Sequence, residues 1–237
     1  LLNLNLDKSE VRKIGFPLSS DLIKRELLIA GGTIQGAIKS IKYGVSMNIA
    51  GGTHHAFSNK GEGFCLLNDQ AIAANYLIKH KGIRRILIID LDVHQGNGTA
   101  QIFNSEPNVF TFSMHGKKNY PFKKEKSDLD IELEDNTSDV EYLNILKNIL
   151  PRLINKFKPE FIFYLAGVDV IQTDKLGRLS LSIKGCEKRD EIVFSMCKKE
   201  KIPIQCSMGG GYSENIDTIV DAHLNTFKIA KKILYNY

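Results

Sequence analysis

Three chemically active side chains follow one another closely at the end of an apolar run. Asp90, Asp92 and His94 come after residues 86–89, which read Ile-Leu-Ile-Ile. Such a run is typical of a strand buried on both faces of a parallel sheet. Because side chains alternate along a strand, we expect all three groups on one face. Buried charges need a partner, and a metal ion is the simplest one for two carboxylates and an imidazole. The alternative is a buried charge pair that only shapes the fold.

Four further predicted strands also carry glycines or reactive side chains just beyond their carboxyl ends. They are expected at residues 45–50, 108–112, 161–165 and 202–206, followed by Gly-Gly-Thr-His-His, Ser-Met-His-Gly, Ala-Gly-Val-Asp and Ser-Met-Gly-Gly-Gly-Tyr, respectively. Open parallel sheets form their sites at the edge where the carboxyl ends meet. We therefore expect these groups to converge on one site.

Helical periodicity alternates with the predicted strands. Helices are expected after a Ser19 or Ser20 cap, over 69–81, after a capping box that begins at Ser138, over 185–199 and over 213–234. This alternation predicts an α/β fold, a three-layer α/β/α arrangement with a central parallel sheet. No repeat, linker or composition break divides the sequence, so residues 1–237 are expected to form a single domain.

Composition excludes several classes of protein. With 237 residues, 43% of them hydrophobic, the chain can bury a sizeable core and is not disordered. It has no apolar run of the ~18 residues that span a membrane, and its first residues do not form a signal peptide. We expect a cytoplasmic protein, or a nuclear one if its source is a eukaryote, with no membrane partner.

Cysteine spacing and charge add two further expectations. The four cysteines have no CxxC spacing and fit reduced thiols; they are Cys65, Cys186, Cys197 and Cys206. Net charge is +5, which is mild for this length. The basic stretch 117–126 is interrupted by Pro121 and Glu125, so we interpret it as a solvated loop and predict no nucleic-acid partner.

The reactive groups together suggest metal-assisted hydrolysis. If Asp92, His94 and Asp169 bind one metal, a position is left for water and substrate, as in catalytic zinc sites. His54 and His55 lie on a glycine-flanked turn and could act as an acid–base pair.

Three more side chains could support that chemistry. Asp90 and Asn97 could orient the two imidazoles from behind. Tyr212 follows three glycines and could donate a hydrogen bond to a developing oxyanion opposite the metal. A packed aromatic at the rim of the site is the alternative for Tyr212.

Five segments of the sequence carry a resemblance to a known family. They are 51–56 (GGTHHA), 61–65 (GEGFC), 90–98 (DLDVHQGNG), 166–169 (AGVD) and 209–212 (GGGY). In these segments, and in their order, the chain resembles the histone deacetylase family of the arginase/deacetylase fold. The first two look closest to class IV and its bacterial relatives, and Asn97 stands where class I members carry aspartate.

The resemblance implies a zinc-dependent amidohydrolase that converts an Nε-acyl-lysine amide to lysine and a carboxylate. Asp92, His94 and Asp169 would bind one Zn²⁺ ion per chain, with Fe²⁺ as an alternative. His55 would be the general base and acid, and His54 its electrostatic partner. Tyr212 would polarise the scissile carbonyl.

The resemblance also implies residues for substrate and for a second ion. Gly63, Phe64, Gly210 and Gly211 would contact the substrate, and the Gly63 carbonyl would accept the substrate N–H. A structural K⁺ or Na⁺ ion would be held by Asp90, Asp92, His94, Ser113 and Met114. The family's first strand and adjoining segment have no counterpart here, so we expect them to be absent. Tyr120, in a loop that departs from the class I pattern, is a candidate wall residue.

Three other functions stay open. A deacylase of small acylated amines, such as acetylpolyamines, would use the same site. An arginase-like ureohydrolase needs a second metal, but Gly96 and Ile171 stand where that fold places further carboxylates. A non-catalytic reader of acyl-lysine would have lost a ligand or Tyr212. The expected partner is an acylated lysine of a protein or peptide, or an acylated small amine, and the sequence does not predict the oligomeric state.

Overall fold

The computed structural model describes residues 3–235, which fold around one parallel six-stranded sheet. The strands lie in the order β1-β6-β5-β2-β3-β4, and every neighbouring pair is parallel. In chain order they are β1 (Val45–Asn48), β2 (Ile86–Asp90), β3 (Val109–Gly116), β4 (Leu129–Leu133), β5 (Phe161–Leu165) and β6 (Ile204–Ser207).

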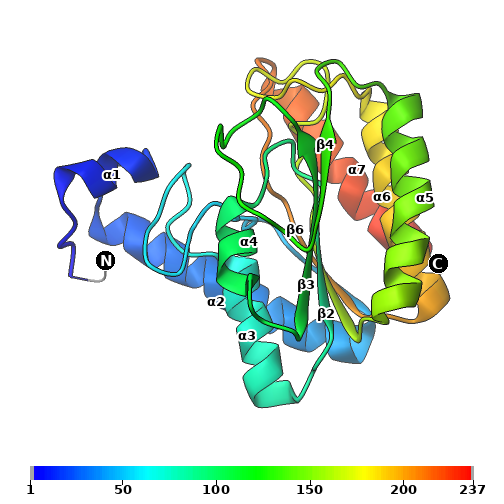
Figure 1. The fold of residues 1–237 in the computed structure, drawn as a ribbon, viewed down its shortest axis with the longest axis horizontal. Helices are drawn as coiled ribbons and strands as arrows, with labels where there is room; N and C mark the ends of the chain where they lie inside the picture. Colours follow the sequence, from blue (N-terminus) through cyan, green and yellow to red (C-terminus); the bar gives the residue numbers. More distant parts are fainter. Residues whose placement is uncertain (1–2, 236–237) are drawn as a thin grey trace.

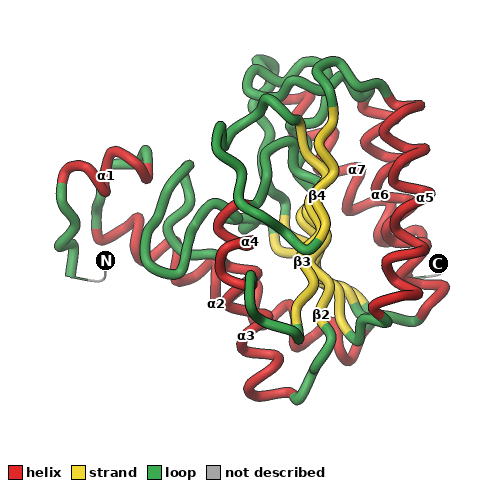
Figure 2. Tube along the Cα trace, in the orientation of Figure 1, coloured by secondary structure: helices red, strands yellow, loops and turns green. Residues whose placement is uncertain are grey.

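Helices cover both faces of this sheet (Figure 1). The helices are α1 (Lys8–Ile14), α2 (Ser20–Tyr43), α3 (Asp69–Lys81), α4 (Asn97–Phe103), α5 (Asp139–Phe157), α6 (Ile183–Glu200) and α7 (Ile216–Leu234). Figure 2 shows α5, α6 and α7 on one side of the strands, with α2, α3 and α4 on the other. The predicted three-layer α/β/α architecture is confirmed.

Strand β2 shows why the sheet is buried on both faces. Leu87 and Ile89 join the core cluster formed with α5, α6 and α7. Ile86 and Ile88 join the cluster on the α2 and α3 side. All five residues of β2 are buried, because its alternating apolar side chains pack against the helices on both faces of the sheet. Helix α1 stands away from the sheet (Figure 1) and packs through a small separate cluster of apolar residues.

The order of the strands creates a reversal point between β2 and β5. From β2 the chain proceeds to β3 and β4 on one side, whereas β5 and β6 lie on the other side. The crossovers on the two sides therefore diverge, and they leave a crevice above the carboxyl ends of β2 and β5. Ligands of open α/β sheets bind at this kind of point. It is where Asp92 and Asp169 follow their strands.

The structure corrects several details of the sequence prediction. Helices α1 and α4 and strand β4 were not predicted. Because β4 pairs with β3 from Phe112 to Gly116, β3 continues past the expected end at residue 112. Ser113 and Met114 thus lie inside a strand, not beyond it. Strand β1 ends two residues early, at Asn48, and β6 starts two residues late, at Ile204.

Two further local predictions were wrong. Ser138 does precede α5, but its side chain makes no capping hydrogen bond. The neighbouring Asp139 carboxylate instead accepts hydrogen bonds from the backbone N–H and hydroxyl of Ser182, at 2.8 and 2.6 Å. Strand β2 ends at Asp90, so the turn after the strand, rather than strand alternation, places Asp92 and His94. Within residues 3–235, no helix combines the length and apolar character needed to span a membrane.

Candidate metal centre and acid–base site

Three side chains at the reversal point form a cluster with metal-ligand geometry. Asp92, His94 and Asp169 are buried, and one ligand atom from each lies within 4.8 Å of the other two. No other such group occurs among residues 3–235. His94 Nδ1 lies 3.0 Å from Asp92 Oδ1 and 3.2 Å from Asp169 Oδ2. The structure therefore brings together the three residues that the sequence proposes as ligands.

The oxygen atoms of this cluster fit a bound cation. Asp169 Oδ1 accepts the backbone N–H of Val93 at 2.9 Å, but the buried Oδ2 atom has no well-aligned hydrogen bond and lies 3.2 Å from His94 Nδ1. Asp92 Oδ2 is satisfied by the N–H of Gly210 at 2.9 Å. A buried carboxylate oxygen without a well-aligned donor is unfavourable, and a divalent cation bound by this oxygen and by His94 would satisfy both atoms. Two carboxylates and one imidazole form a donor set that suits Zn²⁺ or Fe²⁺.

Glycines make room for this cluster. A Cβ atom at Gly210 would overlap the Asp169 carboxylate, and one at Gly167 would overlap the Asp92 carboxylate. Backbone can approach the ligand oxygens here only because these side chains are missing. This close approach explains why glycine occupies both strand-end segments.

The two carboxylates of the cluster also attract protons. Burial lowers the pKa of His94, but the Asp169 and Asp92 carboxylates outweigh it and raise the pKa to about 10. Burial and repulsion from Asp92 raise the pKa of Asp169. A proton is therefore held where a cation would bind, and the two compete.

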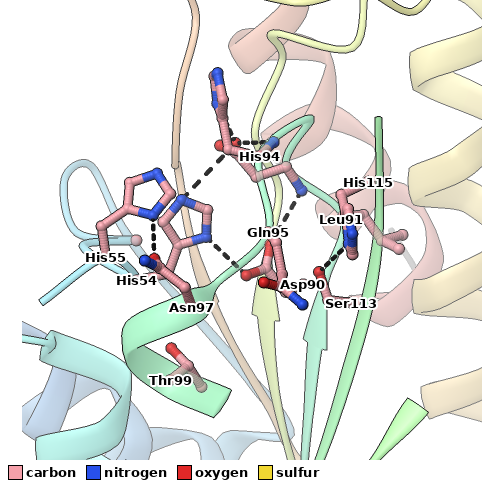
Figure 3. Close-up of polar contacts among 12 residues, drawn as sticks. His54, His55, Asp90, Leu91, His94, Gln95, Asn97, Thr99, Ser113 and His115 are labelled. Carbon is pink, nitrogen blue, oxygen red and sulfur yellow. Dashed lines mark hydrogen bonds and ion pairs between the residues drawn. The ribbon is translucent and has the colours of Figure 1, made fainter. Parts of the chain in front are cut away.

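The two neighbouring histidines contact different polar partners (Figure 3). His54 Nδ1 lies 2.7 Å from Asp90 Oδ2, and its Nε2 lies 3.9 Å from Asp92 Oδ1. Burial lowers the pKa of His54, but these two carboxylates outweigh it and raise the pKa to about 9. His54 is therefore an imidazolium at neutral pH.

His55 is neutral for complementary reasons. Burial, followed by repulsion from His54, lowers the pKa of His55 well below its ordinary value. Its Nδ1 atom lies 2.6 Å from Asn97 Oδ1 (Figure 3), and its ring lies 4.1 Å from that of His54, centroid to centroid. Asp90 and Asn97 thus contact the two imidazoles as the sequence analysis expected.

A glutamate that the sequence analysis missed sets the direction of this hydrogen bond. Glu62 Oε1 accepts from Asn97 Nδ2 at 2.8 Å and from the Tyr120 hydroxyl at 2.7 Å. A carboxylate only accepts, so the NH₂ group of Asn97 must face Glu62. The Asn97 oxygen then faces His55, which must donate from Nδ1. Consequently the Nε2 lone pair of His55 is free to take a proton. The only signal in the sequence was the position of Glu62 inside the GEGFC segment.

A cavity of about 700 Å³ opens over these groups. Gly63, Phe64 and Gly210 line it, together with Tyr120 and Tyr212. Gly211 is not among the lining residues of the described chain; a Cβ atom there would meet Val168 and Ile219.

Phe64 and Tyr212 lie at the mouth of the cavity. Phe64 has a positive φ of 65°, and its ring is tilted against that of Phe16, with 5.2 Å between ring centroids. The backbone N–H of Tyr212 donates to Asp174 Oδ2 at 2.6 Å, and 38% of the residue is exposed. Burial and the nearby Asp92 and Asp169 carboxylates raise the pKa of Tyr212, so its hydroxyl keeps its proton and can donate.

The residues expected at a monovalent cation lie beside the metal cluster. Asp90 and Ser113 are register partners across β2 and β3. The Asp92 N–H donates to Asp90 Oδ1 at 3.2 Å, and the Ser113 hydroxyl lies 2.9 Å from His115 Nδ1 (Figure 3). Met114 follows Ser113 in β3. Ser113 and Met114 lie inside β3 and not beyond its end, and the ion site stays a prediction.

A buried arginine connects the two turns that carry the candidate metal ligands. Arg189 of α6 is fully buried, and its Nη1 atom donates to the carbonyls of Leu91 and Gly167 at 3.2 and 2.5 Å. Its Nε donates to Asp190 Oδ1 at 2.9 Å. The guanidinium thus ties the residue before Asp92 to the segment before Asp169. Nothing in the helical pattern of α6 marked this role.

Comparison with known proteins decides the family. The model of the histone deacetylase domain matches residues 4–227. The chain belongs to the histone deacetylase family. That family comprises hydrolases that act on carbon–nitrogen amide bonds, and the expected resemblance is confirmed.

Relatives at the level of sequence and structure agree with this placement. An uncharacterized protein of Picosynechococcus sp. is 45% identical over 222 residues, which cover 94% of this chain and 74% of the relative. Histone deacetylase 2 of Arabidopsis thaliana is 34% identical over 193 residues, which cover 80% of this chain and 50% of the relative. The chain thus spans only half the length of the plant protein.

Two solved structures share the fold. The HD domain of HDA15 has a TM-score of 0.73 at 24% identity, over 90% of this chain and 64% of that one. Acetylpolyamine aminohydrolase from Burkholderia pseudomallei has a TM-score of 0.74 at 21% identity, over 89% of this chain and 63% of that one. At this level of identity the likeness concerns the fold alone.

Proposed function

We propose that the chain is a zinc-dependent deacylase that hydrolyses an Nε-acyl-lysine amide to lysine and a carboxylate. One observation carries the proposal: a single cavity exposes Asp92 and His94 of the metal cluster, both histidines and Tyr212. Zn²⁺, or alternatively Fe²⁺, would be held by Asp92, His94 and Asp169. Such an ion supplies Lewis acidity toward water and the acyl carbonyl.

The chain's own residues would move the protons. His55 presents a free Nε2 lone pair and can take a proton from the attacking water, then return it to the leaving amine. His54, paired with Asp90 at 2.7 Å, would add positive charge beside the His55 ring, whose centroid lies 4.1 Å from its own. The Tyr212 hydroxyl can donate to the developing oxyanion of the acyl carbonyl. Gly63 and Phe64 would line the path of the acyl-lysine chain.

The rival functions have less support. A two-metal ureohydrolase needs further carboxylates, but the cluster contains only Asp92, His94 and Asp169 among the described residues. A non-catalytic reader of acyl-lysine would need neither a full set of three metal ligands nor two histidines whose pKa values are shifted in opposite directions. A deacylase of acylpolyamines would use the same chemistry, so only the substrate distinguishes it.

The test is hydrolysis by purified protein loaded with Zn²⁺ or Fe²⁺. Nε-Acetyl-lysine peptides, peptides with longer acyl chains and acetylpolyamines would be compared, with Asp169→Ala as the matched inactive control. We expect release of free lysine and one metal ion per chain. Two metal ions at the cluster, or bound metal and bound peptide without turnover, would contradict the proposal.

A further inference from the structure

The charged side chains around the mouth of the cavity are almost all positive. Those that line it are Lys13, Arg25, Lys118, Lys175, Arg178 and Asp92. Asp92 belongs to the metal cluster at the bottom, so the rim itself carries five cations and no carboxylate among the lining residues that the structure describes. Four of the five side chains are between 55% and 61% exposed. These long side chains can therefore reach a substrate that lies across the mouth.

Three of the five cations pair with carboxylates that do not line the cavity, and a fourth, Arg25, pairs with the buried Glu26 at 2.5 Å. Asp135 lies 3.5 Å from Lys118 and 3.2 Å from Arg178, yet it does not line the cavity. Glu214 lies 3.5 Å from Lys175. Exposed pairs of this kind interact weakly in water. Lys118, Lys175 and Arg178 therefore remain available to a negatively charged partner.

The arrangement is built into the fold rather than left to mobile loops. Two loops carry three of the cations, residues 117–128 after β3 and residues 174–178 after β5. Asn119 is almost completely buried and joins them: its Nδ2 donates to the Leu176 carbonyl at 2.7 Å, and its Oδ1 accepts from the Arg178 N–H at 3.2 Å. Within the first loop, the Lys124 ammonium group donates to the carbonyls of Asn119 and Pro121 at 2.6 and 2.7 Å.

Buried Gln95 ties the first loop to the metal-bearing turn. Its side chain donates to the Glu125 carbonyl at 2.7 Å and accepts the Glu125 N–H at 2.9 Å. The lysine-rich loop is thus positioned by the residue that follows His94. The basic stretch that the sequence presents as a solvated loop has a fixed place beside the candidate active site.

We propose that this cationic rim selects acyl-lysine groups flanked by acidic residues. The proposal rests on the deacylase function proposed above and names its substrate class. An acylpolyamine and a lysine-rich segment both bring positive charge to the rim, so both are disfavoured. Complementary potentials of this kind act mainly on the rate of encounter and on the choice of partner. Phe122 and Phe16 at the same mouth can cover the apolar parts of the peptide.

The expected size of the effect follows from Coulomb's law. Two unit charges about 10 Å apart in water change an equilibrium about twofold before salt screening. Replacing two flanking lysines by two glutamates changes the charge of the peptide by four. The acidic peptide should therefore have a kcat/KM about tenfold higher than the basic one at low ionic strength.

Three peptides test this inference. They have equal length and one Nε-acetyl-lysine, flanked by two Glu, two Gln or two Lys. We expect kcat/KM to fall in that order and the differences to shrink in 0.5 M salt, at which the Debye length is only about 4 Å. Lys118→Gln combined with Lys175→Gln should reduce the preference several-fold. Lys228→Gln combined with Lys232→Gln, at two exposed lysines of α7 that do not line the cavity, is the control with an equivalent loss of charge.

Binding separates this inference from the function on which it rests. The same peptides would be titrated by fluorescence anisotropy into metal-loaded Tyr212→Phe protein. Turnover with equal or reversed charge preference, or faster hydrolysis of an acetylpolyamine than of the acidic peptide, would overturn the inference alone. Tighter binding of the acidic peptide without turnover by the parent protein would support the rim and reject the deacylase. Binding that is indifferent to charge would reject the rim whatever the activity.

Discussion

Glu62→Gln tests the proposed direction of the hydrogen bonds behind His55. In the parent protein, flipping the Asn97 amide would place two acceptor oxygens 2.8 Å apart, at Asn97 and Glu62. A hydrogen bond to a charged group contributes about 1.5–3 kcal/mol, and the flipped state loses it and adds repulsion. The amide therefore stays in one orientation, which keeps the proton of His55 on Nδ1.

A glutamine at position 62 removes that constraint with little change of shape. Its own NH₂ group can face the Asn97 oxygen, so both orientations of Asn97 form one neutral hydrogen bond. The two His55 tautomers then become similar in free energy, to within about 1.4 kcal/mol, which is a factor of ten. Only the tautomer with a free Nε2 can act as a base. We expect kcat/KM to fall about two- to tenfold, with metal content unchanged.

The measurement joins kinetics with ¹⁵N NMR of histidine-labelled protein. The His55 nitrogens should change from a single tautomer to a mixture in Glu62→Gln. Tyr120→Phe is the matched control, because it removes one hydrogen bond to Glu62 but leaves the bond between Glu62 and Asn97. An unchanged His55 tautomer in Glu62→Gln, together with unchanged kcat/KM, would refute the reasoning.

Three further predictions concern the metal and the reacting groups. Asp169→Ala should abolish metal binding and activity together, because only two ligands remain; metal analysis checks this, and a fully loaded variant would contradict the ligand set. Tyr212→Phe should lower kcat by about 10²–10³ with little change in peptide affinity, since an oxyanion donor acts in the transition state. His55→Ala should reduce kcat by about 10²–10⁴ and His54→Ala by less, both with metal retained; the reverse order would exchange their roles.

Metal affinity should rise with pH. In the metal-free protein the His94 pKa is raised to about 10, so at neutral pH a metal must displace that proton. Affinity should therefore fall at least about tenfold for each unit by which pH decreases in the neutral range, since Asp169, whose pKa is also raised, adds to the proton of His94. Calorimetry in buffers of different ionisation enthalpy would count the protons released. Affinity independent of pH between 6 and 8 would show that His94 is not protonated in the metal-free state.

The same shift has a consequence for stability. A raised pKa means that folding favours protonated His94, so this contribution to stability is fully present below the ordinary pKa of about 6.5 and is lost as pH rises through about 10. Metal-free protein should accordingly lose stability on the alkaline side, whereas bound metal should oppose that loss. Thermal unfolding of both forms across this range would check it.

The part of the site that follows strand ends was predictable from the sequence. Apolar runs such as 86–89 identify buried parallel strands, and the crossover order of an α/β sheet brings the residues after them to one edge. This is why Asp92, His94 and Asp169 could be grouped without coordinates. The reason given for β2 was nevertheless wrong, because Asp92 and His94 owe their positions to a turn.

Strand β4 shows where local patterns fail. Its residues, Leu129–Leu133, alternate apolar and acidic side chains at the edge of the sheet, and most of them are only partly buried. An edge strand presents a weaker hydrophobic signal than a central one. Missing it shortened β3 and placed Ser113 and Met114 beyond a strand that in fact contains them.

Residues that act through other residues were the hardest to find. Asn97 and Tyr120 lie 35 and 58 positions after Glu62 along the chain, yet both donate to the same carboxylate oxygen of Glu62. Arg189 reaches Leu91 across 98 positions. Sequence spacing reports neighbours within a helix or strand, but it does not report which loop side chains meet. Metal ligands can be proposed from their type and their place after a strand. The direction of the hydrogen bonds from His55 through Asn97 depends on whether the group at the end of this chain is charged, and here that group is the Glu62 carboxylate.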